Sequence, residues 1–275
     1  MKASEAGAFW ERNAETWTRH VRAGYDIYRD ALNSPTFLDT LPPIAGRRGL
    51  DMGCGEGANT RHLARRGARM DGIDIAPTFI RHAREAESAE PLGIAYSVAD
   101  GTSLPFADSS FDFVTAFMSL MDMPDTDAVL AEAWRVVRPG GFLQFSILHP
   151  CFSPPHRRVL RDAGGEARAV EVADYFNGRD GAVERWGFGR APAAEKAVSP
   201  LFEVPRFHRT LSQWVDALVG AGFLLERMVE PCASPELAAA EPEVADTRVV
   251  PQALIVRVRR PEMGRPRLDP PDPHP

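Results

Sequence analysis

A glycine-rich turn between a short apolar segment and a helical pattern is the feature that most constrains this chain. The segment Gly49-Leu50-Asp51-Met52-Gly53-Cys54-Gly55-Glu56-Gly57 precedes a helical pattern that begins near Ala58. Glycine lacks Cβ and tolerates positive φ, so three glycines at alternate positions predict a sharp turn beside a bulky ligand. Backbone N–H groups and a helix N-terminus would then face a crevice at the carboxyl end of a strand. Open α/β sheets bind nucleotide-like ligands at such crevices.

Strand and helix patterns alternate on the C-terminal side of this turn. We expect helices at 58–66, 77–87 and about 129–137, and strands at 47–52, 68–74, 93–100, 111–117 and 142–148. Alternation at this spacing predicts a parallel sheet. A helix that bears Trp214 and two further strands, 223–229 and about 253–259, complete the pattern.

An acidic residue at the end of the second strand fits a ribose-binding position. Asp74 follows Gly53 by 21 residues, and Gly53, Gly55 and Ala58 satisfy the dinucleotide pattern G-x-G-x-x-G/A. A carboxylate in this place can accept hydrogen bonds from both ribose hydroxyls. The glycine turn and Asp74 together leave two ligand classes open, because nicotinamide enzymes carry the same pattern.

Later segments resemble one enzyme family. The word LDMGCGEG resembles the first motif of the class I S-adenosylmethionine (SAM)-dependent methyltransferases, and Asp100-Gly101 with LPFADSSFDFV resembles the segment at and after their third strand. The run EAWRVVRPGGFLQFSI is similar to a later structural signature, and FHRTLSQWVDALVGAGFLLERMVEP resembles the closing segment of the small-molecule, methyltransferase-11-like branch. A nicotinamide enzyme has no particular need for Asp100, so this order of motifs favours the methyltransferases over an NAD(P)-dependent oxidoreductase.

The resemblance implies a fold and a cofactor site. The expected fold is α/β: a Rossmann-like, seven-stranded, mostly parallel sheet with helices on both faces, an N-terminal helical lid and an insertion after strand 5. The implied cofactor is SAM, with Asp74 at its ribose, Asp100 at its adenine amino group, and Phe117 and Met118 beneath its methionine part. The predicted cofactor-binding residues are Tyr28, Asp51, Gly53, Cys54, Gly55, Asp74, Ile75, Asp100, Gly101, Phe117 and Met118.

The domain organisation follows from the same patterns. We expect a lid at 1–45, a SAM-binding core at 46–150, a substrate-cover insertion at 151–208, the C-terminal part of the core sheet at 209–261 and a disordered tail at 262–275. The lid would place Tyr25 or Tyr28 towards a sulfonium or an amine, because aromatic faces attract cations. The insertion has little periodicity but many aromatic residues, which suits an apolar or cyclic acceptor or packing against the lid.

Methyl transfer to nitrogen or oxygen of a small-molecule acceptor is the expected activity, with an activated carbon as a further option and specialised metabolism as a compatible setting. Imidazole titrates near neutral pH, so His149 and His208 are the candidate general bases, and Asp122 is a further candidate. The alternative is a SAM-binding protein that uses the cofactor without methyl transfer, as a cyclase would. The histidines and acids lack metal-ligand spacing, so no metal is expected.

Composition restricts the partners. A net charge of −6 disfavours nucleic-acid and anionic-membrane binding, and a 44% hydrophobic content is ample for a core. No segment approaches the roughly 20 apolar residues of a membrane span, and the N-terminus shows no secretory signal. Cys54, Cys151 and Cys232 are scattered, which indicates reduced thiols in a cytoplasmic protein. An oligomer is compatible with the sequence.

Overall fold

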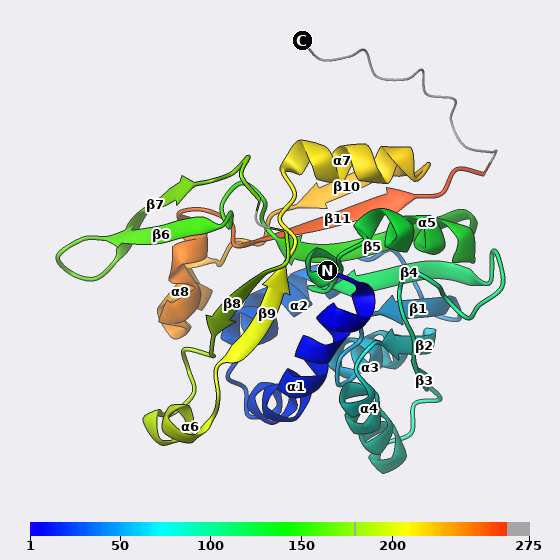
Figure 1. Ribbon diagram of the computed structural model, residues 1–275, viewed down its shortest axis with the longest axis horizontal. Helices are drawn as coiled ribbons and strands as arrows, with labels where there is room; N and C mark the ends of the chain where they lie inside the picture. Colours follow the sequence, from blue (N-terminus) through cyan, green and yellow to red (C-terminus); the bar gives the residue numbers. More distant parts are fainter. Residues whose placement is uncertain (179, 263–275) are drawn as a thin grey trace, which may run out of the picture.

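A seven-stranded sheet organises the molecule (Figure 1). The computed structural model describes residues 1–178 and 180–262. The strands lie in the order β10-β11-β5-β4-β1-β2-β3. Their bounds are β1 Arg48–Met52, β2 Arg69–Asp74, β3 Ala95–Val98, β4 Phe111–Phe117, β5 Val137–Leu148, β10 Leu224–Val229 and β11 Ala253–Arg259.

Five of these strands run parallel, and the last two do not. β1 pairs in parallel with β2 and β4, β2 pairs in parallel with β3, and β4 with β5. β11 pairs antiparallel with both β5 and β10. The predicted fold class is therefore confirmed, including the antiparallel pair. β5 begins earlier than expected, because the Pro139-Gly140-Gly141 segment extends the strand and exchanges backbone hydrogen bonds with Arg260.

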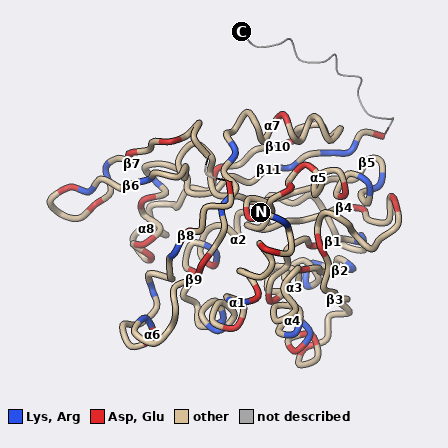
Figure 2. The backbone as a smooth tube through the Cα atoms, viewed as in Figure 1, with Lys and Arg blue, Asp and Glu red and all other residues tan. Residues whose placement is uncertain are grey.

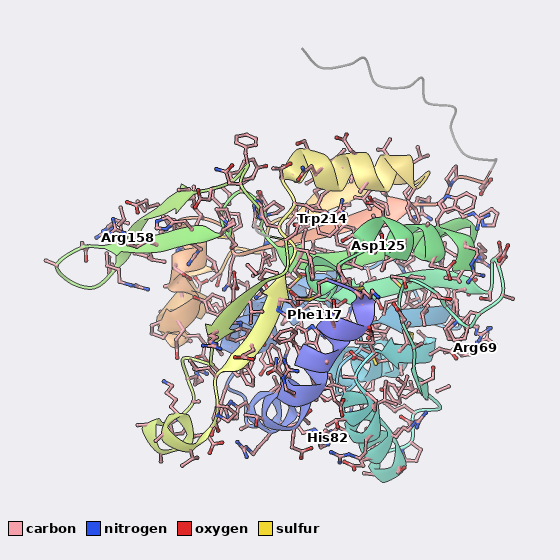
Figure 3. All side chains as sticks on the ribbon, in the orientation of Figure 1. Arg69, His82, Phe117, Asp125, Arg158 and Trp214 are labelled. Atoms are coloured by element: carbon pink, nitrogen blue, oxygen red, sulfur yellow. The ribbon has the colours of Figure 1, made fainter. Side chains whose placement is uncertain are left out.

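Helices cover both faces of the sheet. One face packs against α5 (Thr126–Val136) and α7 (Leu211–Gly220), with Trp214 in the buried cluster (Figure 3). The other face packs against α2 (Ser34–Asp39), α3 (Ala58–Arg65) and α4 (Pro77–Ala89). Alternation along β4 explains this division, because Val114 belongs to the first cluster and its neighbour Phe113 to the second.

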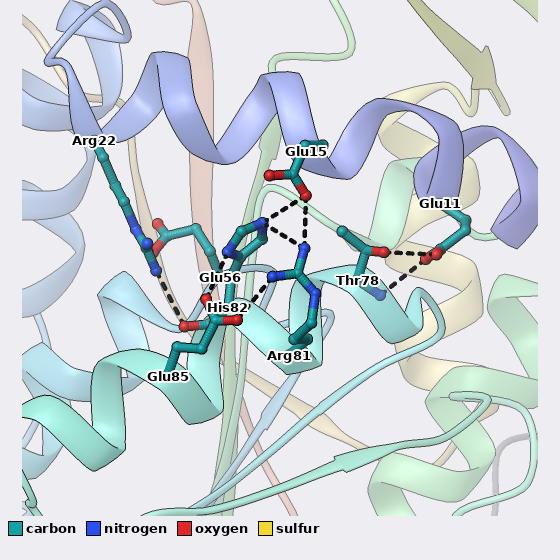
Figure 4. A network of polar contacts seen from close by, with 8 residues as sticks. All are labelled: Glu11, Glu15, Arg22, Glu56, Thr78, Arg81, His82 and Glu85. Carbon is teal, nitrogen blue, oxygen red and sulfur yellow. Dashed lines mark hydrogen bonds and ion pairs between the residues drawn. The ribbon is translucent and has the colours of Figure 1, made fainter.

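The N-terminal segment forms α1 (Ala3–Arg22), then the π-helix η1 (Tyr28–Asn33), then α2. Helix α1 crosses in front of α4 and lies beside β9 (Figure 1). Polar contacts fasten α1 to α4 (Figure 4). The Glu11 carboxylate accepts from the Thr78 backbone N–H at 3.0 Å and from its hydroxyl at 2.7 Å, and Glu15 contacts Arg81 and His82.

The insertion after β5 contains regular structure, although its sequence predicts little. It folds into two hairpins, β6 (His156–Arg161) with β7 (Ala167–Ala173) and β8 (Ala182–Trp186) with β9 (Phe202–Arg206), with the helix α6 (Ala193–Val198) between β8 and β9. The first hairpin projects from the molecule and carries Arg158, whereas the second lies against α1 (Figures 1 and 3). β6, β7 and β8 escaped prediction because most of their side chains are exposed, which removes the pattern that burial leaves in a sequence.

The second hairpin is locked to α1 by aromatic packing. The ring of Trp17 lies 5.4 Å from Trp186, 5.2 Å from Phe188 and 5.0 Å from Phe202, centroid to centroid. Such pairs contribute about 0.5–1.5 kcal/mol each beyond the area that they bury. The expected lid and the expected cover therefore form one packed unit.

Shorter elements complete the described chain. These are the 3₁₀ helix η2 (Leu120–Asp122) after β4, the helix α8 (Pro235–Ala240) and the 3₁₀ segment η3 (Pro242–Arg248) before β11. Every helix within 1–178 and 180–262 is too short or too polar to cross a lipid bilayer. The predicted disordered tail lies outside the described residues, except for Glu262.

Candidate active site

The glycine turn joins β1 to α3 and is built from left-handed backbone. Gly53, Gly55 and Gly57 have φ values of 67°, 56° and 89°. A Cβ on Gly53 would lie 2.5 Å from the Ser119 Cβ, and one on Gly57 would lie 2.6 Å from the Tyr96 hydroxyl oxygen. A Cβ on Gly55 would meet no heavy atom within 4 Å, and this residue lines a cavity. The turn thus leaves room for a ligand to approach the backbone at Gly55.

Asp74 lies at the end of β2 and supports that turn directly. Its carboxylate accepts from the Gly55 N–H and from the Ala76 N–H, both at 2.9 Å. The side chain is buried and borders the cavity, and burial raises its pKa to about 6. Each carboxylate oxygen keeps a further lone pair, so the group can still accept from ribose hydroxyls.

Asp51 has a different place from the one predicted. Its carboxylate accepts from the Thr60 hydroxyl at 2.6 Å and from the Thr115 hydroxyl at 2.8 Å, and the residue does not line the cavity. The predicted cofactor contact is therefore corrected to a structural role: Asp51 fastens β1 to α3 and β4 beneath the glycine turn. Burial raises the pKa of Asp51 to about 6, although both hydroxyls oppose the shift.

The ends of β3 and β4 border the same cavity. Asp100 accepts from the Thr102 N–H at 2.9 Å and leaves its other oxygen without a hydrogen bond from the described residues. Phe117, near the centre of Figure 3, is followed by Met118, whose φ of 51° is rare outside glycine. This left-handed residue turns the chain at the end of β4, and its N–H donates to the Ser146 carbonyl at 2.8 Å.

One cavity of about 960 Å³ unites these positions. Gly53, Asp74, Asp100 and Phe117, from four strand ends, all line it. The other predicted cofactor-binding residues that line it are Tyr28, Cys54, Gly55, Ile75, Gly101 and Met118.

The hydroxyl of Tyr28 is turned towards η3. It donates to the Glu243 carbonyl at 2.5 Å and to the Asp246 carboxylate at 2.8 Å. Burial and the neighbouring Asp246 raise the pKa of Tyr28 above its usual range. The aromatic ring of Tyr28, and not its hydroxyl, is therefore the part that is free to contact a ligand in the cavity.

Both predicted catalytic histidines lie outside the cavity, which corrects that prediction. The buried ring of His149 lies 2.9 Å from Glu230 through Nε2, and its Nδ1 accepts from the Cys151 N–H at 3.2 Å. Burial lowers the pKa of His149. The His208 Nε2 lies 2.9 Å from the Tyr175 carbonyl oxygen. Each ring holds a loop of the insertion instead of facing an acceptor.

The cavity is also bordered by one polar residue that the sequence analysis did not identify, Asn33, and by one that it named only as a further candidate base, Asp122. Asn33, at the end of η1, is 4% exposed and borders the cavity, and its amide makes no hydrogen bond to the described residues. Asp122 is 5% exposed and borders it from η2, where Arg206 of β9 donates to its Oδ1 at 2.6 Å. A π-helix often marks a functional site, but periodicity in the sequence does not reveal one.

Within 1–178 and 180–262, no group of three or more His, Cys, Asp or Glu side chains is placed to hold a metal ion. The cavity wall is instead rich in aromatic rings on the side of the lid and the insertion. These are Trp10, Trp17, Tyr25, Trp186 and Phe188.

Comparisons with known proteins agree with this geometry. Residues 50–145 match the family model described as "Methyltransferase domain". A SAM-dependent methyltransferase structure from Mesorhizobium loti superposes with a TM-score of 0.65 at 27% identity, over 82% of this chain and 96% of that one. Residues 50–145 therefore carry a methyltransferase domain, and the fold is that of a SAM-dependent methyltransferase. The cofactor that this domain and fold imply is SAM, as the sequence predicted.

Curated relatives match this chain over a shorter part. The methyltransferase GfsG of Streptomyces halstedii is 41% identical over 38% of this chain and 39% of its own length. A ubiquinone biosynthesis O-methyltransferase of Paracidovorax citrulli is 36% identical over 41% of this chain and 48% of its own length. The chain thus spans less than half of either relative.

Proposed function

We propose that this methyltransferase transfers a methyl group from SAM to a small-molecule acceptor. The observation that carries the proposal is the convergence of four strand ends on one cavity of about 960 Å³ that α1, η1 and β8 also line. Pockets of this size and mixed lining are typical of small-molecule and cofactor sites. The names of both curated relatives include methyl transfer, which favours this function over a cyclase-like use of bound SAM.

The residues of the cavity suit the parts of SAM. Asp74 would accept from the ribose hydroxyls, Asp100 from the adenine amino group, and the carbonyls near Phe117 and Met118 from the methionine ammonium. The open backbone at Gly55 gives the cofactor space beside the turn. When bound, SAM supplies an electrophilic methyl group on a sulfonium.

The chain's own contribution is to position the acceptor and exclude water. Helix α1 and the β8–β9 hairpin form the wall opposite the strand ends, and their aromatic rings border the cavity. Alignment of two reactants in a closed site is worth as much as ~7–11 kcal/mol of barrier. We therefore assign the lid at 1–45 and the cover at 151–208 to acceptor binding.

The same proposal covers the cellular location and the binding partners of the protein. Three free cysteines suit a reducing cytoplasm. Basic and acidic residues are interspersed along the described chain (Figure 2), and such a mixed surface suits a small acceptor better than nucleic acid or a membrane surface. An oligomer is compatible with this site.

Calorimetry with SAM and with S-adenosylhomocysteine tests cofactor binding, and we expect both to bind. Incubation with methyl-labelled SAM and a metabolite extract then tests transfer, and we expect a labelled small molecule. Tight binding without any labelled product would favour the cyclase-like alternative. Binding of NAD(P)H in place of SAM would favour an oxidoreductase.

A further inference from the structure

The buried carboxylate of Asp122 lies where β4 and the β8–β9 hairpin meet. η2 follows β4 directly, and the Phe207 N–H donates to the Met121 carbonyl at 3.3 Å, so the end of β9 is fastened to η2. Arg206 donates from Nη1 to Asp122 Oδ1 at 2.6 Å and from Nε to Glu184 Oε2 at 2.9 Å. Asp122, Glu184 and Arg206 all line the cavity.

One oxygen of Asp122 is left for a ligand. Within 1–178 and 180–262, Oδ2 accepts no hydrogen bond, although the side chain is only 4% exposed. Asp74, the buried acid that we assign to the ribose of SAM, differs from Asp122. Each of its two carboxylate oxygens accepts a hydrogen bond from a backbone N–H group. Because Asp122 borders the cavity, a group bound there can donate a hydrogen bond to this oxygen.

The β8–β9 hairpin also places an aromatic ring, Trp186, on the wall of the same cavity. Trp186 pairs with Phe202, Glu184 with Val204, and Ala182 with Arg206, so one hairpin carries an aromatic end and a charged end. The four residue-to-residue steps from Phe202 to Arg206 span about 13 Å of strand. An acceptor with a flat apolar body and one polar group could therefore contact Trp186 and Asp122 together.

We propose that Asp122 Oδ2 is the hydroxyl-binding group and general base for an acceptor with an acidic hydroxyl, a phenol or an enol, whose ring lies against Trp186. This inference rests on the proposed methyl transfer and names its substrate class. Arg206 holds the carboxylate in place, and Glu184 holds Arg206. The geometry thus gives Asp122 the role predicted for His149 and His208, which do not line the cavity.

The step balances without another reactant. The hydroxyl proton moves to Asp122 Oδ2, and an oxygen lone pair forms the new C–O bond. As it forms, the methyl carbon separates from sulfur, and the electron pair of that bond stays on sulfur as a neutral thioether. The proton then leaves Asp122 to solvent after the product departs.

The residue chemistry favours a hydroxyl over an aliphatic amine. A carboxylate beside an amine stabilises the ammonium form, which has no lone pair for attack, and Arg206 repels that cation. An acidic hydroxyl instead needs a nearby base, stronger than an exposed carboxylate, to accept its proton. Burial raises the pKa of Asp122 to about 6, with Arg206 opposing and Glu184 reinforcing the shift, so the group is ionised at neutral pH and is a stronger base than an exposed carboxylate.

Binding of a matched probe pair tests the inference without turnover. 2-Naphthol and 2-methoxynaphthalene share a ring system, but only the first donates a hydrogen bond. With S-adenosylhomocysteine present, we expect the wild-type chain to bind 2-naphthol about tenfold or more tightly, because hydrogen bonds to a charged group are the strong ones. The Asp122→Asn variant should lose this preference, whereas the control Glu203→Gln, which changes an ion pair with Arg185 in the same hairpin and does not line the cavity, should keep it.

A second variant separates the loss of the Asp122 carboxylate from misfolding caused by an unpaired Arg206. Asp122→Asn leaves Arg206 partly unpaired, so Asp122→Asn/Arg206→Gln replaces the ion pair by two neutral amides, and it too should lose the preference. Retained preference in either variant, or failure of the wild-type chain to bind either naphthalene, overturns the inference. Binding of S-adenosylhomocysteine to both variants, measured by calorimetry, separates that result from failure of the proposed function.

Discussion

At the residue scale, Asp74 is the residue on which cofactor affinity should depend most. It accepts from two backbone N–H groups and borders the cavity, so Asp74→Ala removes the ribose acceptor and loosens the glycine turn together. We expect SAM affinity to fall at least tenfold in calorimetry, since hydrogen bonds to a charged group contribute about 1.5–3 kcal/mol each. Asp71→Ala is the control, because Asp71 lies on the same strand and contacts Arg48 instead. Equal affinities for both variants would show that the ribose assignment is wrong.

Asp51 should couple stability to pH. Burial raises its pKa to about 6 in the folded chain, against about 3.9 when unfolded, so the folded state binds this proton more tightly. Its stabilising contribution is full below about pH 4 and is lost as pH rises through about 6. The Asp51→Asn variant should therefore gain stability relative to the wild type between pH 4.5 and pH 7 in urea unfolding. A difference between the two proteins that stays constant with pH would contradict this assignment.

Residue type and spacing predicted residues that border the cavity more successfully at the strand ends than among the histidines. Gly55, Asp74 and Asp100 follow strands whose order fixes where their ends meet, so a local pattern was sufficient to place them. His149 and His208 were chosen for their chemistry alone. Their rings contact Glu230 and the Tyr175 carbonyl, partners 81 and 33 residues away in the chain, and no local pattern reports such contacts.

At the element scale, α1 stabilises the start of α4. The residue before α4, Ala76, has no side chain that can cap it, and the Glu11 carboxylate of α1 supplies the missing acceptor at Thr78. Loss of a cap costs about 0.5–2 kcal/mol. We expect Glu11→Ala to lower the free energy of unfolding by about 1–2 kcal/mol in urea titrations and to release bound S-adenosylhomocysteine faster.

Glu15→Ala is the matched control for that measurement. Glu15 lies one turn along the same face of α1 and contacts Arg81 and His82, but its side chain is 69% exposed (Figure 4). Exposed ion pairs contribute little to stability, so we expect almost no change. Equal losses from the two variants would mean that Glu11 does not act as a cap.

Elements of the core were predictable where burial leaves a pattern in the sequence. β4 has the predicted bounds because it is a short apolar run buried on both faces, and α3 and α4 begin at the expected residues because each buries one face. The β6–β7 hairpin and α8 lie at the surface, where packing leaves no period in the sequence. The extension of β5 through Gly140 and Gly141 depends on pairing with Arg260, which is distant in the chain.

At the scale of the whole molecule, the cavity couples separate parts of the chain. Its wall draws on α1, the glycine turn, the ends of β2, β3 and β4, and the β8–β9 hairpin, so it exists only when these have assembled. The motifs predicted the sheet side of this wall, and the aromatic composition of the insertion indicated the other. The sequence did not predict the packing of Trp17 against Trp186 and Phe202, which joins α1 and the β8–β9 hairpin into one part of the cavity wall.

A ligand of such a cavity should stabilise the entire fold. S-adenosylhomocysteine at 100 times its Kd should raise the free energy of unfolding by about 2.7 kcal/mol, because the unfolded chain has no site for it. Urea unfolding at several ligand concentrations measures this rise, with NADH at the same concentrations as the control. The rise should grow with the logarithm of the concentration, and it should shrink in Asp74→Ala, which removes one strand end from the site. Stabilisation by NADH alone would assign the cavity to a nicotinamide, because the same four strand ends would then be selecting a dinucleotide.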